Sequence, residues 1–360
     1  MLGKITLGGE HVFDRNTISS NRSGYFDSWV DKISKDFNVQ YTFGGYYSLV
    51  GIIESLKTSS DKEIELLLPS YLCPSMLKPF KNWNVNYSFY KVDQSLYVDE
   101  THLRNQISAK TTAVLFIDYF GTSQVRRLSG LIHELKNKNI QIIQDIVQTI
   151  DLAKAELYGD FVFNSVRKFL PVEASILLSK EAMNTEFGHS MPPVQKKRRG
   201  QFLRKISLKT GIDLSFAFLP DFKRFESEYY QRHVVRLPEK SRKYLSQLDF
   251  EKLIWEQRFY YEKLVQDYGN LQPQLLRHQS STVIPLGLVL SVKDRNEFRN
   301  FLFGKRIFAP IHWVLSEEID KKEYEGSWSL SEEIITIPLI NLTERKFKYL
   351  TETLDEYFKG

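Results

Sequence analysis

The chain has 360 residues, of which 42% are hydrophobic and 26% charged, the balance of a folded globular protein with a large core rather than of a disordered or fibrous chain. Its 49 basic and 44 acidic side chains leave a net charge of +5, which argues against a duplex nucleic acid as partner. The single cysteine, Cys73, excludes an intramolecular disulfide and a multi-cysteine zinc site. With no apolar leader and no run of about 18 apolar residues, we expect a cytoplasmic protein with no membrane partner.

The first half of the chain alternates between short apolar runs and helical patterns. A helix with an apolar face is predicted from Tyr47 to Leu56, directly after the Gly44-Gly45 pair. Apolar runs typical of strands buried on both faces follow at 64–68, 112–117, 140–143, 161–163 and 175–178. This alternation predicts a three-layer α/β fold with a mostly parallel sheet. Ligands of such sheets bind beyond the carboxyl ends of the strands.

The second half predicts a different organisation. From 191 to about 236 the chain carries two prolines and a basic run, and we expect a long excursion with some helix. A helical pattern spans 241–268. Strand-like segments at 282–290 and 334–339, with helices near 294–302 and 344–358, predict a smaller α/β unit. We therefore predict a large domain over 1–240, and an interdomain helix with a small C-terminal domain over 241–360.

Three positions in the first half are candidates for chemistry. The Gly44-Gly45 turn offers free N–H groups and a helix dipole to a phosphate, although a plain turn before a core helix is the commoner meaning of so short a motif. Asp145 follows a buried strand at a ligand-binding edge, or it caps a helix. Lys168 lies among apolar residues, where burial depresses the pKa of an amine as imine formation requires; alternatively it is a surface lysine with a buried stem.

The order of these three features resembles the pyridoxal-phosphate (PLP) enzymes of fold type I. Within that fold, the chain is most similar to the sugar aminotransferases of the DegT/DnrJ/EryC1/StrS family. The resemblance covers most of the chain. The segments that carry it are Leu66 to Tyr71, Trp83 to Asp93, Thr111 to Gly121, Gln144 to Gln148 and Leu245 to Arg258.

The resemblance implies a role for each candidate residue. Lys168 forms the imine with the cofactor and then moves a proton, while Asp145 pairs with the protonated pyridine nitrogen, whose charge makes the ring an electron sink. Gln148 lies near the ring oxygen. The residues expected to hold the phosphate are Gly45, Tyr46 and Ser165.

Several positions depart from the family pattern. The position that usually stacks an aromatic ring on the cofactor falls on Cys73, so either Cys73 or Tyr71 is expected to contact the ring. Asp118 replaces a histidine, and the glycines that usually follow the lysine are absent from 171–175. In the family, a partner subunit contributes an asparagine-tyrosine-arginine motif, which has no clear counterpart near 233–242 in this chain. These changes indicate a divergent branch.

Two further features are open to two interpretations. The basic residues Lys196, Arg198 and Arg199 could bind a nucleotide diphosphate or form a solvated loop, because a basic run is a generic signal. His312 could face the active site or lie in the core of the small domain. The seven histidines are scattered, and no metal site is predicted.

The resemblance implies a homodimeric, PLP-dependent aminotransferase. It would move an amino group from an amino acid, with glutamate as the expected donor, to a keto-sugar nucleotide for polysaccharide or glycosylated-metabolite biosynthesis. Two alternatives stay open: an elimination or dehydration on the same cofactor and fold, or a non-catalytic binding or scaffold homologue.

Overall fold

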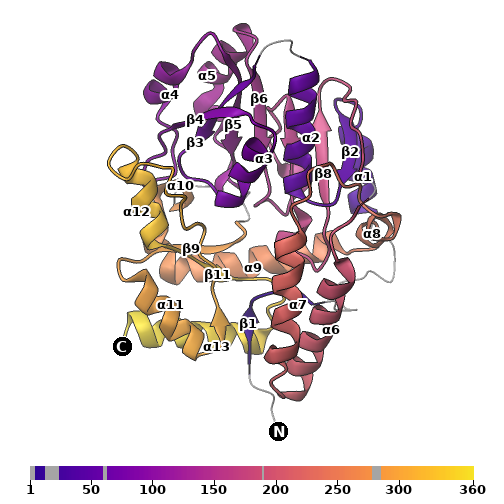
Figure 1. Cartoon of the computed structure of the whole chain (residues 1–360). Helices are drawn as coiled ribbons and strands as arrows, with labels where there is room; N and C mark the ends of the chain where they lie inside the picture. The colour runs from indigo at the N-terminus through magenta and orange to yellow at the C-terminus, as the bar shows by residue number, and fades with distance from the viewer. Residues whose placement is uncertain (1–4, 13–23, 60–62, 189, 278–284) are drawn as a thin grey trace.

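The computed structural model describes residues 5–12, 24–59, 63–188, 190–277 and 285–360 (Figure 1). Within these residues the central sheet has seven strands, in spatial order β2 (Asn38–Thr42), β8 (Ser175–Ser179), β7 (Phe161–Phe163), β6 (Gln141–Asp145), β5 (Thr111–Ile117), β3 (Glu65–Pro69) and β4 (Asn86–Tyr90). The pairs from β7 to β4 are parallel, and β8 runs antiparallel to both of its neighbours. The predicted mostly parallel α/β fold is confirmed.

Helices cover both faces of this sheet, as the alternation of side chains along β7 and β8 shows. Val162 and Ile176 pack in one core cluster, whereas Phe163 and Leu177 pack in another. The helices that contribute to the first cluster are α1 (Tyr25–Ile33), α8 (Glu239–Leu245) and α9 (Phe250–Tyr268). Those that contribute to the second include α2 (Gly45–Thr58), α3 (Leu77–Asn82), α4 (Glu100–Gln106), α5 (Val125–Asn137), α10 (Gln274–Arg277) and α12 (Glu325–Glu333). Burial on both sides explains why these strands are almost continuously apolar.

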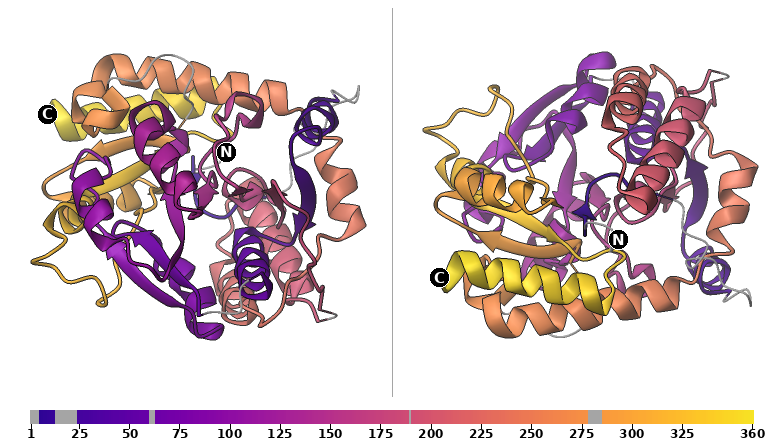
Figure 2. Two further views of the ribbon diagram at one scale, coloured as in Figure 1. Left: turned by 90° about the horizontal axis from the view of Figure 1, so that it is seen from above. Right: turned by 90° about the horizontal axis from the view of Figure 1, so that it is seen from below.

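A smaller unit follows α9 and recruits the N-terminus of the chain. Its antiparallel pair, β9 (Gly287–Ser291) and β11 (Ile334–Pro338), shares a core cluster with α11 (Arg295–Gly304) and α13 (Glu344–Phe358). β1 (Leu7–Gly8) pairs in parallel with β10 (Ile307–Phe308), and Leu7 is buried in the same cluster. Seen from below, β1 lies between this unit and the helices α6 and α7 (Figure 2).

The excursion predicted around 191–236 is a pair of packed helices, α6 (Val194–Thr210) and α7 (Ser215–Glu228), which projects below the sheet (Figure 1). The basic run at 196–199 therefore lies on a helix rather than in a loop. The pattern predicted over 241–268 is divided between α8 and α9, because Asp249 accepts a hydrogen bond from the Lys252 N–H at 3.0 Å and caps a new helix. The strand predicted at 282–290 is found from Gly287, and positions 282–284 lie outside the described residues. None of the described helices is long and apolar enough to cross a membrane.

Candidate active site

The carboxyl edge of the sheet brings together residues that are far apart in sequence. Asp145 is the last residue of β6, and Lys168 ends a short 3₁₀ turn, Val166–Lys168, that follows β7. A cavity of about 120 Å³ lies at this edge, and we call it the small cavity. Six of the residues predicted from the sequence line it: Gly45, Tyr46, Cys73, Asp145, Ser165 and Lys168.

The N-terminus of α2 presents free donors to the small cavity. The N–H groups of Tyr47 and Ser48 donate to the carbonyl of Gly44, at 2.9 and 3.1 Å, but those of Gly45 and Tyr46 find no acceptor in the described part of the chain. A methyl group added to Gly45 would lie 3.3 Å from the carbonyl oxygen of Asn164 and 3.5 Å from Cβ of Ser165. The helix therefore begins in contact with the segment that precedes Lys168, and its dipole favours an anion there.

Asp145 and Lys168 are ionisable groups whose pKa values are shifted by burial, upwards for Asp145 and downwards for Lys168. Burial raises the pKa of Asp145 to about 7, against the hydrogen bond from the Val147 N–H at 2.8 Å and the charge of Lys168. Burial also lowers the pKa of Lys168, and the charge of Arg167 acts in the same direction, whereas Cys73 and Asp145 oppose it. A lowered pKa increases the neutral fraction of the amine, which is the nucleophilic form.

The structure separates the two residues expected to contact a cofactor ring. Cys73 lines the small cavity, with Sγ 3.0 Å from Oγ of Ser75. Tyr71 is fully buried and does not line it; its ring packs 5.4 Å from the ring of Trp313. Trp313 does line the small cavity, and it is therefore a further aromatic candidate for contact with a cofactor ring.

Gln148, predicted beside the cofactor, is buried one turn after Asp145. Its Oε1 accepts a hydrogen bond from the Phe120 N–H at 2.7 Å. Its Nε2 has no acceptor among the described residues, and the side chain does not line the small cavity. A buried amide without an acceptor is costly, so this donor calls for an explanation.

A second cavity of about 420 Å³, which we call the large cavity, shares Arg167 and Lys168 with the small one. Segments of the N-terminus, α6 and the C-terminal unit line it. His312 belongs to this lining; its Nδ1 lies 2.8 Å from Oγ1 of Thr336, and burial together with the charge of Lys168 lowers its pKa to about 3. The imidazole is therefore neutral at physiological pH. The peptide bond between His312 and Trp313 is cis.

The other predicted substrate residues line neither cavity. Arg199 forms a two-pronged ion pair with Asp221 of α7, at 2.6 and 2.8 Å, and Arg198 is exposed. Lys196 is half-buried on the same helix. Arg199 thus contributes to the packing of α6 on α7, and a direct role of the three basic residues in substrate binding stays a prediction.

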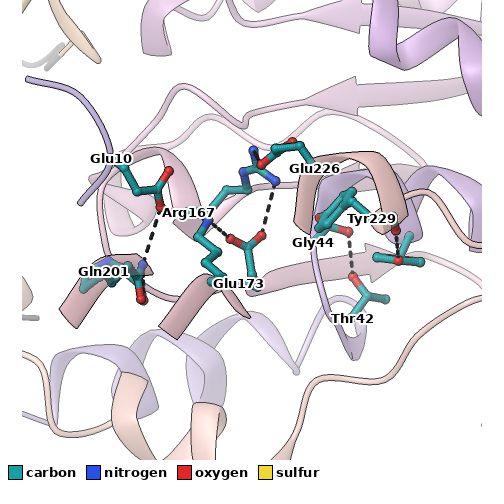
Figure 3. Close-up of polar contacts among 11 residues, drawn as sticks. Glu10, Thr42, Gly44, Arg167, Glu173, Gln201, Glu226 and Tyr229 are labelled. Carbon is teal, nitrogen blue, oxygen red and sulfur yellow. Dashed lines mark hydrogen bonds and ion pairs between the residues drawn. The ribbon is translucent and has the colours of Figure 1, made fainter. Parts of the chain in front are cut away.

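A network of ion pairs surrounds Arg167, the neighbour of Lys168 in sequence, and its innermost members are Glu173 and Lys197 (Figure 3). Arg167 pairs with Glu226 at 2.8 Å and with Glu173 at 3.4 Å, and Lys197 of α6 pairs with Glu173 and with Glu10, the latter at 2.9 Å. Burial alone would lower the pKa of Lys197, but its two acidic partners raise it. Sequence reasoning missed this network. Its signal was Glu173 inside an otherwise apolar segment, because a buried acid requires a cation.

No protein-family model and no curated protein sequence matches this chain. Solved structures do match over almost its whole length. A putative sugar aminotransferase from Streptococcus pneumoniae, Spr1654 in its PMP form, superposes with a TM-score of 0.70 at 13% identity, covering 98% of this chain and 97% of the other. Helicobacter pylori PseC, an aminotransferase of pseudoaminic acid biosynthesis, gives 0.67 at 13%, covering 99% and 100%. CalS13, a sugar aminotransferase from Micromonospora echinospora, gives 0.65 at 14%, covering 99% of each chain. At these identities the likeness shows that the chain has the fold of these proteins.

The arrangement is suited to chemistry on a phosphorylated aldehyde. It combines a buried amine, an anion seat at the start of a helix and a buried carboxyl group within one small cavity. Among the described residues, no group of three or more histidine, cysteine, aspartate or glutamate side chains could hold a metal ion.

Proposed function

We propose that this protein is a PLP-dependent aminotransferase of the DegT/DnrJ/EryC1/StrS type. The observation that carries the proposal is that Lys168, Asp145 and the free N-terminus of α2 meet in one cavity, in a fold shared with sugar aminotransferases.

The residues present fit the cofactor. The free N–H groups of Gly45 and Tyr46, with Ser165, would hold its phosphate. Asp145 would accept a hydrogen bond from the pyridine nitrogen, and a positive ring nitrogen beside it would lower the raised pKa of this carboxyl group. The unpartnered Nε2 of Gln148 would donate to a ring oxygen.

When bound, PLP would supply an electron sink for the carbanion formed at the substrate. Lys168 would hold the cofactor. Its neutral Nζ would be placed to accept a proton from the substrate α-carbon and to return it, a role that its lowered pKa supports. Trp313 and Tyr230 contribute aromatic surface to the wall of the small cavity.

The proposed substrates are an amino acid, glutamate as the first choice, and a keto-sugar nucleotide of polysaccharide or glycosylated-metabolite synthesis. The support is that the structural neighbours are named as sugar aminotransferases. We further propose a cytoplasmic homodimer, on the pattern of the fold type.

The cofactor can be tested by absorbance and by mass spectrometry. Purified protein should be yellow or become so with added PLP, and reduction with borohydride should fix the cofactor on a peptide containing Lys168. Lys168→Ala should lose both signals, whereas Lys240→Ala, which removes an exposed lysine, should keep them. A wild-type protein that shows neither the band nor the adduct would exclude every PLP reaction, transamination and elimination alike, and would favour a binding role.

The reaction type requires a second measurement. Adding glutamate to the loaded protein should release 2-oxoglutarate and convert the cofactor to its amine form. Release of ammonia from a β- or γ-substituted amino acid, with no amine form, would instead indicate elimination.

A further inference from the structure

The large cavity has a strong excess of positive charge. The basic residues among its described lining are Arg167, Lys168, Arg204 and Lys346, and the one acid is Glu10. The pKa of Lys168 is lowered, and Arg167 is already paired with Glu173 and Glu226, so the excess charge comes from Arg204 and Lys346. Basic side chains in a partly enclosed space favour an anionic ligand, because low-dielectric walls concentrate the field.

Arg204 is held in this lining by the N-terminal strand. Its Nη2 donates to the carbonyl of Gly8 at 2.7 Å. A methyl group on Gly9 would lie 2.7 Å from both Nη atoms, and Gly9 has a φ of +75°, which side chains rarely adopt. Glycine at position 9 therefore leaves the space that the guanidinium group occupies.

Arg204 forms no ion pair with any described carboxylate, although much of it is buried. Its one acidic neighbour, Glu10, is already paired with Lys197 and accepts a hydrogen bond from Gln201 at 3.4 Å. Burial lowers the pKa of Arg204, and Glu10 opposes this shift. Burying a guanidinium group without a carboxylate costs stability, so a ligand that supplies the missing anion would explain its position.

The helix α6 divides its inner face between two functions. Lys197, Gln201, Arg204 and Leu208 follow one another at spacings of four, three and four residues, which places them on the same side. The first two residues bind Glu10 and the segment after Lys168. Arg204 and Leu208, further along, line the large cavity.

We propose that Arg204 is a specificity-determining residue that binds an anionic group, carboxylate or phosphate, of the substrate that reacts at Lys168. Lys346 adds charge across the cavity, and Leu286, Phe308 and Pro310 provide an apolar wall. This inference rests on the proposed function, because it takes Lys168 as the reacting group. A planar guanidinium group can contact either kind of anion through two parallel hydrogen bonds.

The test measures anion binding without turnover. Titration calorimetry on the purified full chain loaded with PLP would use glutarate as the carboxylate probe and inorganic pyrophosphate as the phosphate probe. Wild type should bind at least one of them, and Arg204→Gln should weaken that binding about ten- to hundredfold, the loss expected for one charge-assisted contact. Lys209→Gln, which removes an exposed charge from the same helix, should bind as wild type does.

A second variant keeps the test decisive if Arg204→Gln does not fold. Leu208 is 36% exposed and lines the large cavity, so Leu208→Glu adds a negative charge without removing a bond, and it should weaken the same probe. The two half-reactions then identify the source of the anion. A raised KM for glutamate alone assigns Arg204 to the donor carboxylate, and a raised KM for the acceptor alone assigns it to a phosphate.

Two results would overturn the inference: no binding of either probe to wild type, or binding unaffected by Arg204→Gln and Leu208→Glu. A protein that forms the lysine-bound cofactor but fails these tests loses the inference on Arg204 and keeps the proposed function. A protein that never binds PLP loses the proposed function, whatever the two anion probes show.

Discussion

The two cavities that meet at Lys168 are built in different ways. The small cavity is formed largely at strand ends and at the start of α2, so most of its polar groups lie close in sequence to an element of the central sheet. The large cavity is formed where the N-terminal strand, α6 and the C-terminal unit converge. One has a carboxyl group and free helix N–H donors; the other has an excess of basic side chains. The difference supports the proposal that the small cavity holds the cofactor and that the lining of the large cavity selects the substrate.

Asp145→Asn should impair the function of the small cavity and leave that of the large cavity intact. The change keeps the shape but leaves a protonated ring nitrogen without its ionic partner, so turnover should fall about a thousandfold, roughly the loss of one partner from a buried ion pair. Steady-state kinetics measure this effect. Binding of glutarate or pyrophosphate should stay within about twofold of wild type, because Asp145 does not line the large cavity. Near-normal turnover in this variant would contradict the role given to Asp145.

Lys197→Met should destabilise the ion-pair network that holds Arg167, a residue that lines both cavities. The lysine side chain is 6% exposed, and its removal leaves Glu10 and Glu173 with one cation fewer, so the free energy of unfolding should fall by about 3 kcal/mol. Urea denaturation measures the loss. Lys305→Met is the matched control: it breaks an exposed pair with Glu356 and should cost at most about 1 kcal/mol. Equal losses in the two variants would show that the network around Arg167 contributes no more to the free energy of unfolding than an exposed ion pair does.

Ser165→Ala sharpens the comparison at the phosphate seat. Removing one hydroxyl donor from a charged ligand should weaken PLP about tenfold, which fluorescence titration of the apo-protein can measure. The anion probes of the large cavity should be unaffected, since Ser165 does not line it. An unchanged affinity for PLP would mean that Ser165 does not bind the phosphate, and Arg167 would be the next candidate for that role.

The sequence predicted the small cavity better than the large one for a physical reason. Asp145 and Lys168 follow buried strands, and the carboxyl edge of a parallel sheet collects such residues whatever the rest of the chain does. Arg204 lies on a helix with no predicted strand next to it in the sequence, and only the tertiary fold brings Gly8 and Gly9 to its guanidinium group.

The fold shows the same limit. The central strands were predicted because they are buried on both faces. In contrast, β2 (Asn38–Thr42) is an edge strand with mostly half-buried side chains and lacks the apolar run that would mark it. The role of Lys197 was hidden for a similar reason, because a basic run does not show which of its members faces inward.

The last prediction concerns Asp118, which donates its N–H to the carbonyl of Asp145 at 2.9 Å. Burial raises the pKa of Asp118 to about 8, although Gln144 and Tyr158 donate hydrogen bonds to it at 2.8 and 3.0 Å. The folded protein then holds a proton that the unfolded chain releases near pH 4, so this group lowers the free energy of unfolding as the pH rises from about 4 to 8.

Asp118→Asn removes that titration and leaves the similar one of Asp145 in place. The difference in unfolding free energy between wild type and variant, measured by urea denaturation at several pH values, should therefore shift against wild type as the pH rises through this window. Contributions from groups that do not interact with Asp118 cancel in the difference. A difference that is constant with pH would mean that Asp118 is ionised in the folded protein, and that its two hydrogen bonds outweigh burial on the side of the molecule where the small cavity lies.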